Sequence, residues 1–166
     1  MQRRRLIIFV AASALVIATA AQAKQELNID AAQGANFNNY KTYTWVKTHP
    51  SGGIDSVHYQ RILGGLDSRL ASKGYRKGSP ADLTIALTLG KQQKVDVDAW
   101  TRYGYHVRNR SYTEGQISVD AFDTKTKKAL WHGQITDSIT PGKPNYDKLN
   151  SALAKLMEHF PATTKH

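Results

Sequence analysis

The chain has 166 residues, of which 40% are hydrophobic and 22% are charged, a composition typical of a folded globular protein rather than a disordered one. It contains no cysteine, which excludes disulfides, a thiolate nucleophile, cysteine metal ligands and lipidation of an N-terminal cysteine. The formal net charge of +10 favours anionic surfaces such as lipid head groups or acidic polysaccharide, and it also serves plain solubility.

The N-terminus predicts an export signal. Three arginines at 3–5 precede an apolar run at 6–18, and Ala21-Gln22-Ala23 has the small-x-small pattern that signal peptidase recognises. The apolar run is shorter than the roughly 20 residues that span a bilayer. We therefore predict a cleavable signal peptide at 1–23, a single domain at 24–161 and a loose tail at 162–166. The expected location is the periplasm or the exterior, where we expect no nucleic-acid partner and no membrane span after cleavage.

The first half of the domain predicts a strand followed by a helix. A polar leader at 24–39 allows an edge strand, and 40–47 is rich in aromatic and β-branched residues, which favours a strand. Apolar residues at helical spacing predict a helix at 55–73, for which Asp55 is a suitable N-cap. Gly74 follows that helix directly and suits a left-handed C-terminal cap.

The second half predicts more strands and a final helix. Residues 82–90 alternate between large aliphatic and small or polar side chains and predict a half-buried strand, while 92–112 predicts a strand or long loop that is only partly regular. Residues 113–138 predict a β-hairpin, and 145–160 predicts an amphipathic helix. The economical fold class is α+β: a two-layer sandwich in which two helices pack on one face of a mostly antiparallel sheet.

Five segments in order resemble a bacterial family, the domain of unknown function numbered 4136. They are FxxYKTYTW at 37–45, LxxKGYR at 70–76, ADLTI at 81–85, YTEGQISVDxxDTKTKKxxWxG at 112–133, and LxKLxxxFP at 153–161. The resemblance covers nearly the whole predicted domain and implies an exported envelope protein of the same fold class. It supplies no reaction and no catalytic residues. Many members carry a lipoprotein signal, from which this chain departs because it has no cysteine.

Spacing predicts no catalytic residues, no metal site and no cofactor. The six histidines form neither an HxxxH nor an HExxH pattern: His49, His58, His106, His132, His159 and His166. The nucleophile-elbow and phosphate-loop patterns are absent as well. Asp120 and Asp123 are three positions apart, so in a strand they face opposite sides and make no ready acid/base pair. Asp123 suits a turn, and Asp120 is interpreted as an ordinary solvent-facing residue. A site in which two or more residues from distant segments converge stays open, with these candidates: His58, His106, His132, Asp120 and Glu114.

The most suggestive binding segment lies at 100–112. It combines aromatic rings, which stack on sugars or lie at lipid head groups, with arginines that hold phosphate or carboxylate: Trp100, Arg102, Tyr103, Tyr105, Arg108, Arg110 and Tyr112. The alternative is a β-ribbon whose aromatics pack on the sheet while its arginines are solvated.

Taken together, these features predict a non-catalytic envelope module that binds an envelope protein, a glycan or an anionic lipid surface. One alternative is a periplasmic hydrolase or metal-dependent enzyme whose residues come from distant segments. Another is an assembly protein that self-associates along an open sheet edge.

Overall fold

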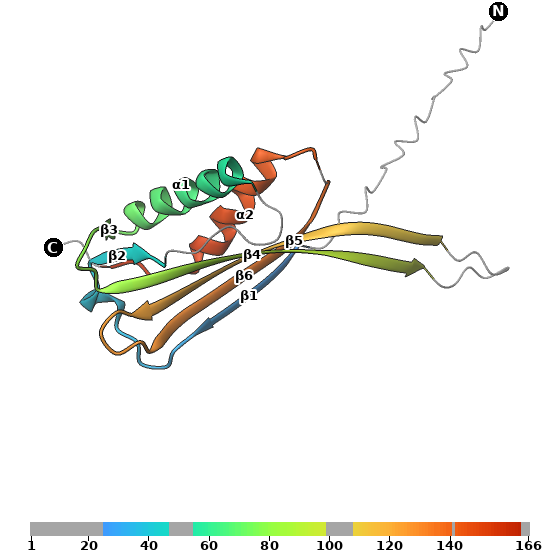
Figure 1. The fold of residues 1–166 in the computed structure, drawn as a ribbon. Coiled ribbons are helices and arrows are strands. Elements are labelled where there is room, and N and C mark those ends of the chain that lie inside the picture. Colours follow the sequence, from blue (N-terminus) through green and yellow to red (C-terminus); the bar gives the residue numbers. More distant parts are fainter. Residues whose placement is uncertain (1–24, 47–54, 99–107, 141, 164–166) are drawn as a thin grey trace, which may run out of the picture.

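Two helices cover one face of a six-stranded sheet in the computed structural model of the chain (Figure 1). The structure describes residues 25–46, 55–98, 108–140 and 142–163. In chain order the elements are β1 (Glu26–Ala31), a 3-10 turn η1 (Phe37–Asn39), β2 (Thr42–Trp45), α1 (Ser56–Ser72), β3 (Arg76–Lys77), β4 (Leu83–Asp98), β5 (Arg108–Asp123), β6 (Ala129–Ile139) and α2 (Tyr146–Glu158). The predicted α+β class and the placement of both helices on one face are confirmed.

The sheet combines a long antiparallel part with a short parallel edge. Its strand order is β1-β6-β5-β4-β2-β3. The pairs β1–β6, β6–β5 and β5–β4 are antiparallel, whereas β2 runs parallel to both β4 and β3. The leader therefore does form an edge strand, β1, as the sequence allowed. The short strand β3 was not predicted, because two exposed basic residues carry no strand pattern.

The strands β4 and β5 are longer than predicted. Each has 16 residues, and they pair without a break from Leu83 opposite Asp123 to Asp98 opposite Arg108. The described ends of 92–112 are therefore regular strand, in line with the β character predicted for this segment, and 99–107 lies outside the described residues. In Figure 1 these two ends project beyond the helices as a two-stranded ribbon. The alternation of valine and aspartate at 95–98 has the two-residue period of a strand, and the backbone of this segment pairs with β5.

The core lies between the sheet and the helices. The odd-numbered side chains of β4 from Leu83 to Leu89 are all buried, which confirms the alternation in the sequence. Phe160 closes one end of this layer, where its ring packs edge-to-face against Trp131 with 4.9 Å between ring centroids. Leu66 and Leu153 bring the two helices into the same core with no exposed surface.

The helix termini follow the sequence signals. The Asp55 carboxylate accepts hydrogen bonds from the backbone N–H groups of Val57 and His58, as an N-cap does. Gly74 has φ of +95°, the left-handed conformation that the C-terminal end of α1 requires. Gly65 lies on the side of α1 that faces α2. A Cβ there would lie 2.9 Å from Cδ1 of Leu153, so Gly65 allows α1 to approach α2 rather than the sheet.

Candidate binding cleft

A cleft of about 860 Å³ opens where the N-terminal turns of α1 and α2 meet the middle of the sheet. Its floor is apolar and combines residues of three strands and both helices: Ile62, Leu89, Ile117, Ile135, Leu149 and Ala152. Its mouth includes Ile139, which is 42% exposed although it is a large aliphatic residue. The cleft therefore offers hydrophobic surface to a ligand.

The sheet arranges the cleft surface in two adjacent rows. Leu89 of β4, Ile117 of β5 and Ile135 of β6 are register neighbours and form an apolar row across three strands. The next row on the same face begins at Lys91, passes Gly115 and ends at Asp137. Because Gly115 has no side chain, the side chain of Ile139 packs over the centre of the second row. Side chains on one face recur every second residue, which is why a charged row directly adjoins an apolar one.

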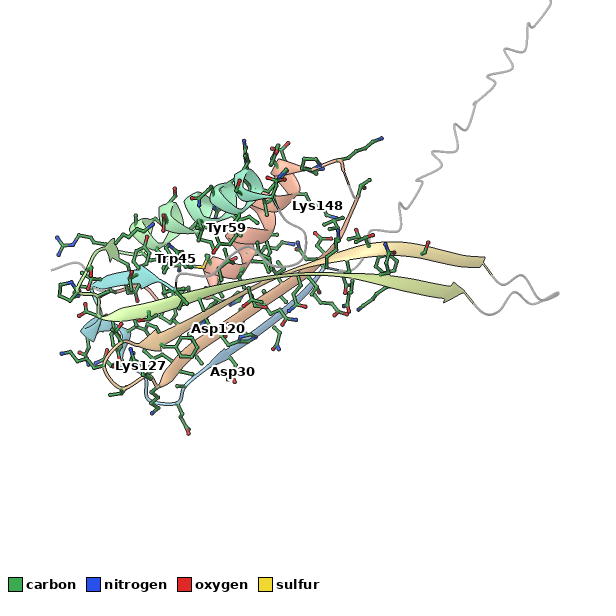
Figure 2. All side chains as sticks on the ribbon, viewed as in Figure 1. Asp30, Trp45, Tyr59, Asp120, Lys127 and Lys148 are labelled. Atoms are coloured by element: carbon green, nitrogen blue, oxygen red, sulfur yellow. The ribbon has the colours of Figure 1, made fainter. Side chains whose placement is uncertain are left out.

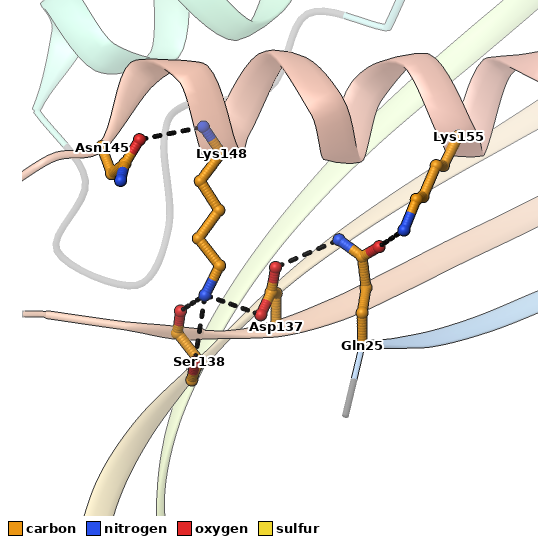
Figure 3. A network of polar contacts seen from close by, with 6 residues as sticks. All are labelled: Gln25, Asp137, Ser138, Asn145, Lys148 and Lys155. Carbon is orange, nitrogen blue, oxygen red and sulfur yellow. Dashed lines mark hydrogen bonds and ion pairs between the residues drawn. The ribbon is translucent and has the colours of Figure 1, made fainter. Parts of the chain in front are cut away.

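A polar network holds α2 against the sheet at one side of the cleft (Figure 3). Nζ of Lys148 reaches from α2 to β6, where it pairs with Oδ1 of Asp137 at 2.8 Å and donates to the carbonyl oxygen and hydroxyl of Ser138. The other oxygen of Asp137 accepts from Gln25 at 3.0 Å, and Gln25 in turn accepts from Lys155 of α2. The three donors of the Lys148 ammonium thus all have protein partners, and Asp137 neutralises its charge.

A second group of polar side chains joins the first turns of the two helices. Nδ1 of His58 pairs with Oδ2 of Asp55, and Nε2 of His58 lies 3.2 Å from the hydroxyl of Tyr146. The rings of His58 and Tyr146 are stacked at 5.8 Å, and the Arg61 guanidinium lies 3.9 Å from the centroid of the Tyr146 ring. Hydrogen bonds from the backbone N–H and the ring of His58 lower the pKa of Asp55 below its usual value. Asp55 is therefore the ionised end of an Asp–His–Tyr chain at the cleft.

Two further lysines line the cleft without an acidic partner. Lys91 lies on β4 and Lys143 in the connection between β6 and α2, and both are exposed. Among the residues that the structure describes, neither ammonium group has a hydrogen bond or an ion pair. These two side chains therefore bring to the cleft positive charge that no carboxylate in the described part of the chain neutralises.

The predicted binding segment contributes one described side chain to this cleft. Tyr112 lines it, next to the point where the β4–β5 ribbon leaves the sheet. Arg108 and Arg110 lie in β5, but only their backbone is described, and the prediction for the remaining residues falls outside the described part of the chain: Trp100, Arg102, Tyr103 and Tyr105. Sequence reasoning missed the rest of the cleft, because its residues come from six separate elements and connections. His58 beside its cap Asp55 was the one available signal.

The acid and base candidates in the described part of the chain do not meet in one place. Nδ1 of His132 pairs with Oδ1 of Asp120 at 2.6 Å on the sheet face opposite the helices, where Asp30 is the register neighbour of His132 (Figure 2). Asp120 was interpreted as a solvent-facing strand residue; it does lie on this outer face, where its carboxylate also has His132 as a hydrogen-bond partner. The buried Glu114 instead pairs with Lys94 at 2.9 Å, which lowers the pKa of the carboxyl.

Within the described residues, no three His, Asp or Glu side chains are grouped closely enough to hold a metal ion. None of the helices seen there has both the length and the hydropathy that a bilayer crossing demands.

Comparisons with known proteins place the chain in a family. A model described as "Domain of unknown function (DUF4136)" matches residues 27–162. The chain belongs to this family. The predicted resemblance is thereby confirmed, and the Asp–His–Tyr chain and the cleft lie within the matched range of this DUF4136 protein. A search of curated proteins gives no significant match.

Solved structures share the fold of this DUF4136 chain at low identity. Two structures of the PelC dodecamer from Paraburkholderia phytofirmans are 10% and 12% identical, with TM-scores of 0.57 and 0.54, and each match covers 85% of this chain and 100% of that one. A PDZ domain protein from Parabacteroides distasonis is 12% identical with a TM-score of 0.50, over 87% of this chain but 38% of that protein. These likenesses show a shared fold.

Proposed function

We propose that this protein is a non-catalytic binding module of the cell envelope whose cleft receives an envelope component. The observation that carries the proposal is the cleft itself, with an apolar floor of buried and partly buried aliphatic residues and charged groups at its edge. Ligand sites in proteins have this composition and volumes of about 300–1,000 Å³. On such a surface, burial of the ligand's apolar part supplies most of the affinity, and the few polar groups at the edge orient the ligand.

The proposed location rests on the N-terminal sequence. An arginine-rich start, a short apolar run and the small-x-small pattern at 21–23 are typical of a cleaved export signal. Fractionation of cells that express the full chain, with mass spectrometry of the N-terminus, tests this. We expect a protein that begins at Lys24 in the periplasmic fraction. A chain that retains 1–23 in the inner membrane would contradict export by cleavage.

Site-specific photo-crosslinking in living cells tests the cleft as the binding site. Ile139 and Val57 are both exposed aliphatic residues, at 42% and 67%, but only Ile139 lines the cleft. A photoreactive phenylalanine analogue at 139 is expected to capture a discrete envelope component, whereas the same analogue at 57 serves as the matched control. The same adducts from both positions, or none from 139, would contradict the assignment of the cleft.

The Asp55–His58–Tyr146 chain favours one alternative, a hydrolase. In this order the imidazole could take a proton from the hydroxyl while the carboxylate orients it, as in hydrolases that use an acid, a histidine and a hydroxyl. The test is release of a chromophore from p-nitrophenyl esters of increasing acyl length. Turnover that Tyr146→Phe removes would support the hydrolase, and the absence of turnover together with the adduct at 139 supports the binding module.

A further inference from the structure

The proposed function does not specify the chemical class of the ligand, but the residues that line the cleft narrow the choice. We infer that the cleft binds an anionic single-chain lipid, with the acyl chain on the aliphatic row and the head group near Lys91 and Lys143. The inference rests on the proposed binding function and adds the chemical class of the ligand. Three features of the cleft carry it: the shape of its floor, the charge beside that floor, and an exposed isoleucine at its mouth.

The floor suits a narrow apolar chain. Leu89, Ile117 and Ile135 lie side by side on three neighbouring strands, and strands in a sheet are about 4.8 Å apart, so this row is about 10 Å long. The first two turns of the helices line the cleft opposite this row with Ile62 and Leu149. The cleft is therefore lined by aliphatic groups from both the sheet and the helices. An acyl chain fills such a space without leaving a polar group unpaired.

The charges next to this row suit an anionic head group. Lys148 and Asp137 neutralise each other, whereas Lys91 and Lys143 keep their charge available in the described part of the chain. Lys91 is two residues from Leu89 on the same face of β4, so it lies directly beside the apolar row. The centre of that second row is apolar, because Gly115 has no side chain and Ile139 packs over it: a Cβ at Gly115 would lie 3.0 Å from Cγ2 of Ile139.

The exposed side chain of Ile139 lies beside the row that contains Lys91, Gly115 and Asp137. It is 42% exposed at the mouth of the cleft, and it follows Asp137 and Ser138 on β6. An aliphatic residue here gives a bound chain continuous apolar contact from the floor to the edge. Chain burial then supplies affinity in proportion to the apolar area removed from water, and the lysines select the head group.

The first experiment compares two single-chain lipids of the same acyl length, one with an anionic phosphoglycerol head group and one with an uncharged glycerol head. The full mature chain is titrated, below the critical micelle concentration, with lysophosphatidylglycerol and with a monoacylglycerol of the same acyl length. We expect the anionic lipid to bind roughly two to thirty times more tightly, the range that two exposed charge pairs give. The difference should shrink as salt is raised, because exposed charges are screened over about 8 Å at 0.15 M ionic strength.

Paired variants assign the effect to the cleft. Ile139→Glu is expected to weaken both lipids at least tenfold, while Val57→Glu, at an exposed aliphatic position outside the cleft, leaves both unchanged. The double variant Lys91→Gln with Lys143→Gln is expected to bind both lipids equally. Lys125→Gln with Lys128→Gln removes the same charge from the exposed β5–β6 turn and should preserve the preference.

The outcomes separate the lipid from the proposed function. Equal binding of the two lipids, lost in Ile139→Glu, overturns the anionic head group and leaves the cleft as a binding site. Absence of lipid binding, with the photo-adduct at 139 still formed, overturns the lipid class and leaves the binding module. Absence of both overturns the two proposals together. A preference for the anionic lipid that only the cleft variants remove supports both.

Discussion

At the scale of single residues, Asp67 holds strand β2 to helix α1. One of its carboxylate oxygens accepts hydrogen bonds from the hydroxyl of Tyr43 and from Nε1 of Trp45, both at 2.7 Å, and the other pairs with Nζ of Lys77 at 3.1 Å. Burial alone would raise the pKa of Asp67, but these three donors outweigh it and lower the pKa. The same arrangement raises the pKa of Tyr43, mainly through burial. Asp67 therefore fixes two aromatic residues of the core edge.

Replacement of Asp67 tests this role. Asp67→Ala leaves the donors of Tyr43 and Trp45 without their acceptor, which we expect to lower the free energy of unfolding by about 2 kcal/mol. Asp67→Asn keeps an acceptor oxygen and should lose clearly less. Urea unfolding at pH 7 measures both, and equal stability of the alanine and asparagine variants would show that the hydrogen bonds contribute little.

At the scale of elements, two adjacent glycines in α1 have opposite surroundings. A Cβ at Gly64 meets nothing within 4 Å, whereas a Cβ at Gly65 would lie 2.9 Å from Cδ1 of the fully buried Leu153 on α2. Glycine in a helix costs about 1 kcal/mol relative to alanine, so Gly64→Ala should stabilise the protein by about that amount. Gly65→Ala gains the same helix propensity but pushes the helices apart, and we expect no gain or a net loss. Thermal unfolding of the two variants tests this difference. Equal stabilisation of both variants would mean that the two helices can move apart at no cost.

The elements were predictable where the pattern is local. Helical spacing with Asp55 and Gly74 at the ends predicted α1 within one residue, and alternation predicted the buried face of β4. The cleft was not predictable, because its polar chain joins His58 to Tyr146, which are 88 residues apart in the sequence. Spacing along a chain gives the face of each element but not which faces meet. Which faces meet depends on how the elements pair in three dimensions. One example is the parallel pairing of β2 with β4, because the chain between these two strands crosses the sheet as α1.

At the scale of the whole molecule, four carboxyl groups link the outer parts of the fold, and each has a lowered pKa. Asp82 accepts from the backbone N–H groups of Lys41 and Thr42, which join the start of β2 to the start of β4. Asp123 accepts from the N–H groups of the β5–β6 turn, chiefly that of Thr126. Hydrogen bonding to the ionised form is the common cause, with Lys94 as the main donor for Glu114. With Asp67, these groups are more acidic in the folded chain than in the unfolded one.

This predicts the direction in which stability depends on pH. A carboxyl group with a lower pKa in the folded state stabilises the fold fully above its unfolded pKa, about 3.9 for Asp and 4.3 for Glu, and loses that contribution as pH falls through the folded value. We therefore expect the urea midpoint to be constant from about pH 7 to 5 and to fall steeply below about pH 4. Asp82→Asn keeps an oxygen that can accept from Lys41 and Thr42 but cannot ionise, so its decline on acidification should be shallower than that of the native chain. A variant curve parallel to the native one down to pH 2.5 would mean that Asp82 takes no part in acid unfolding, and that the link between β2 and β4 does not depend on its charge.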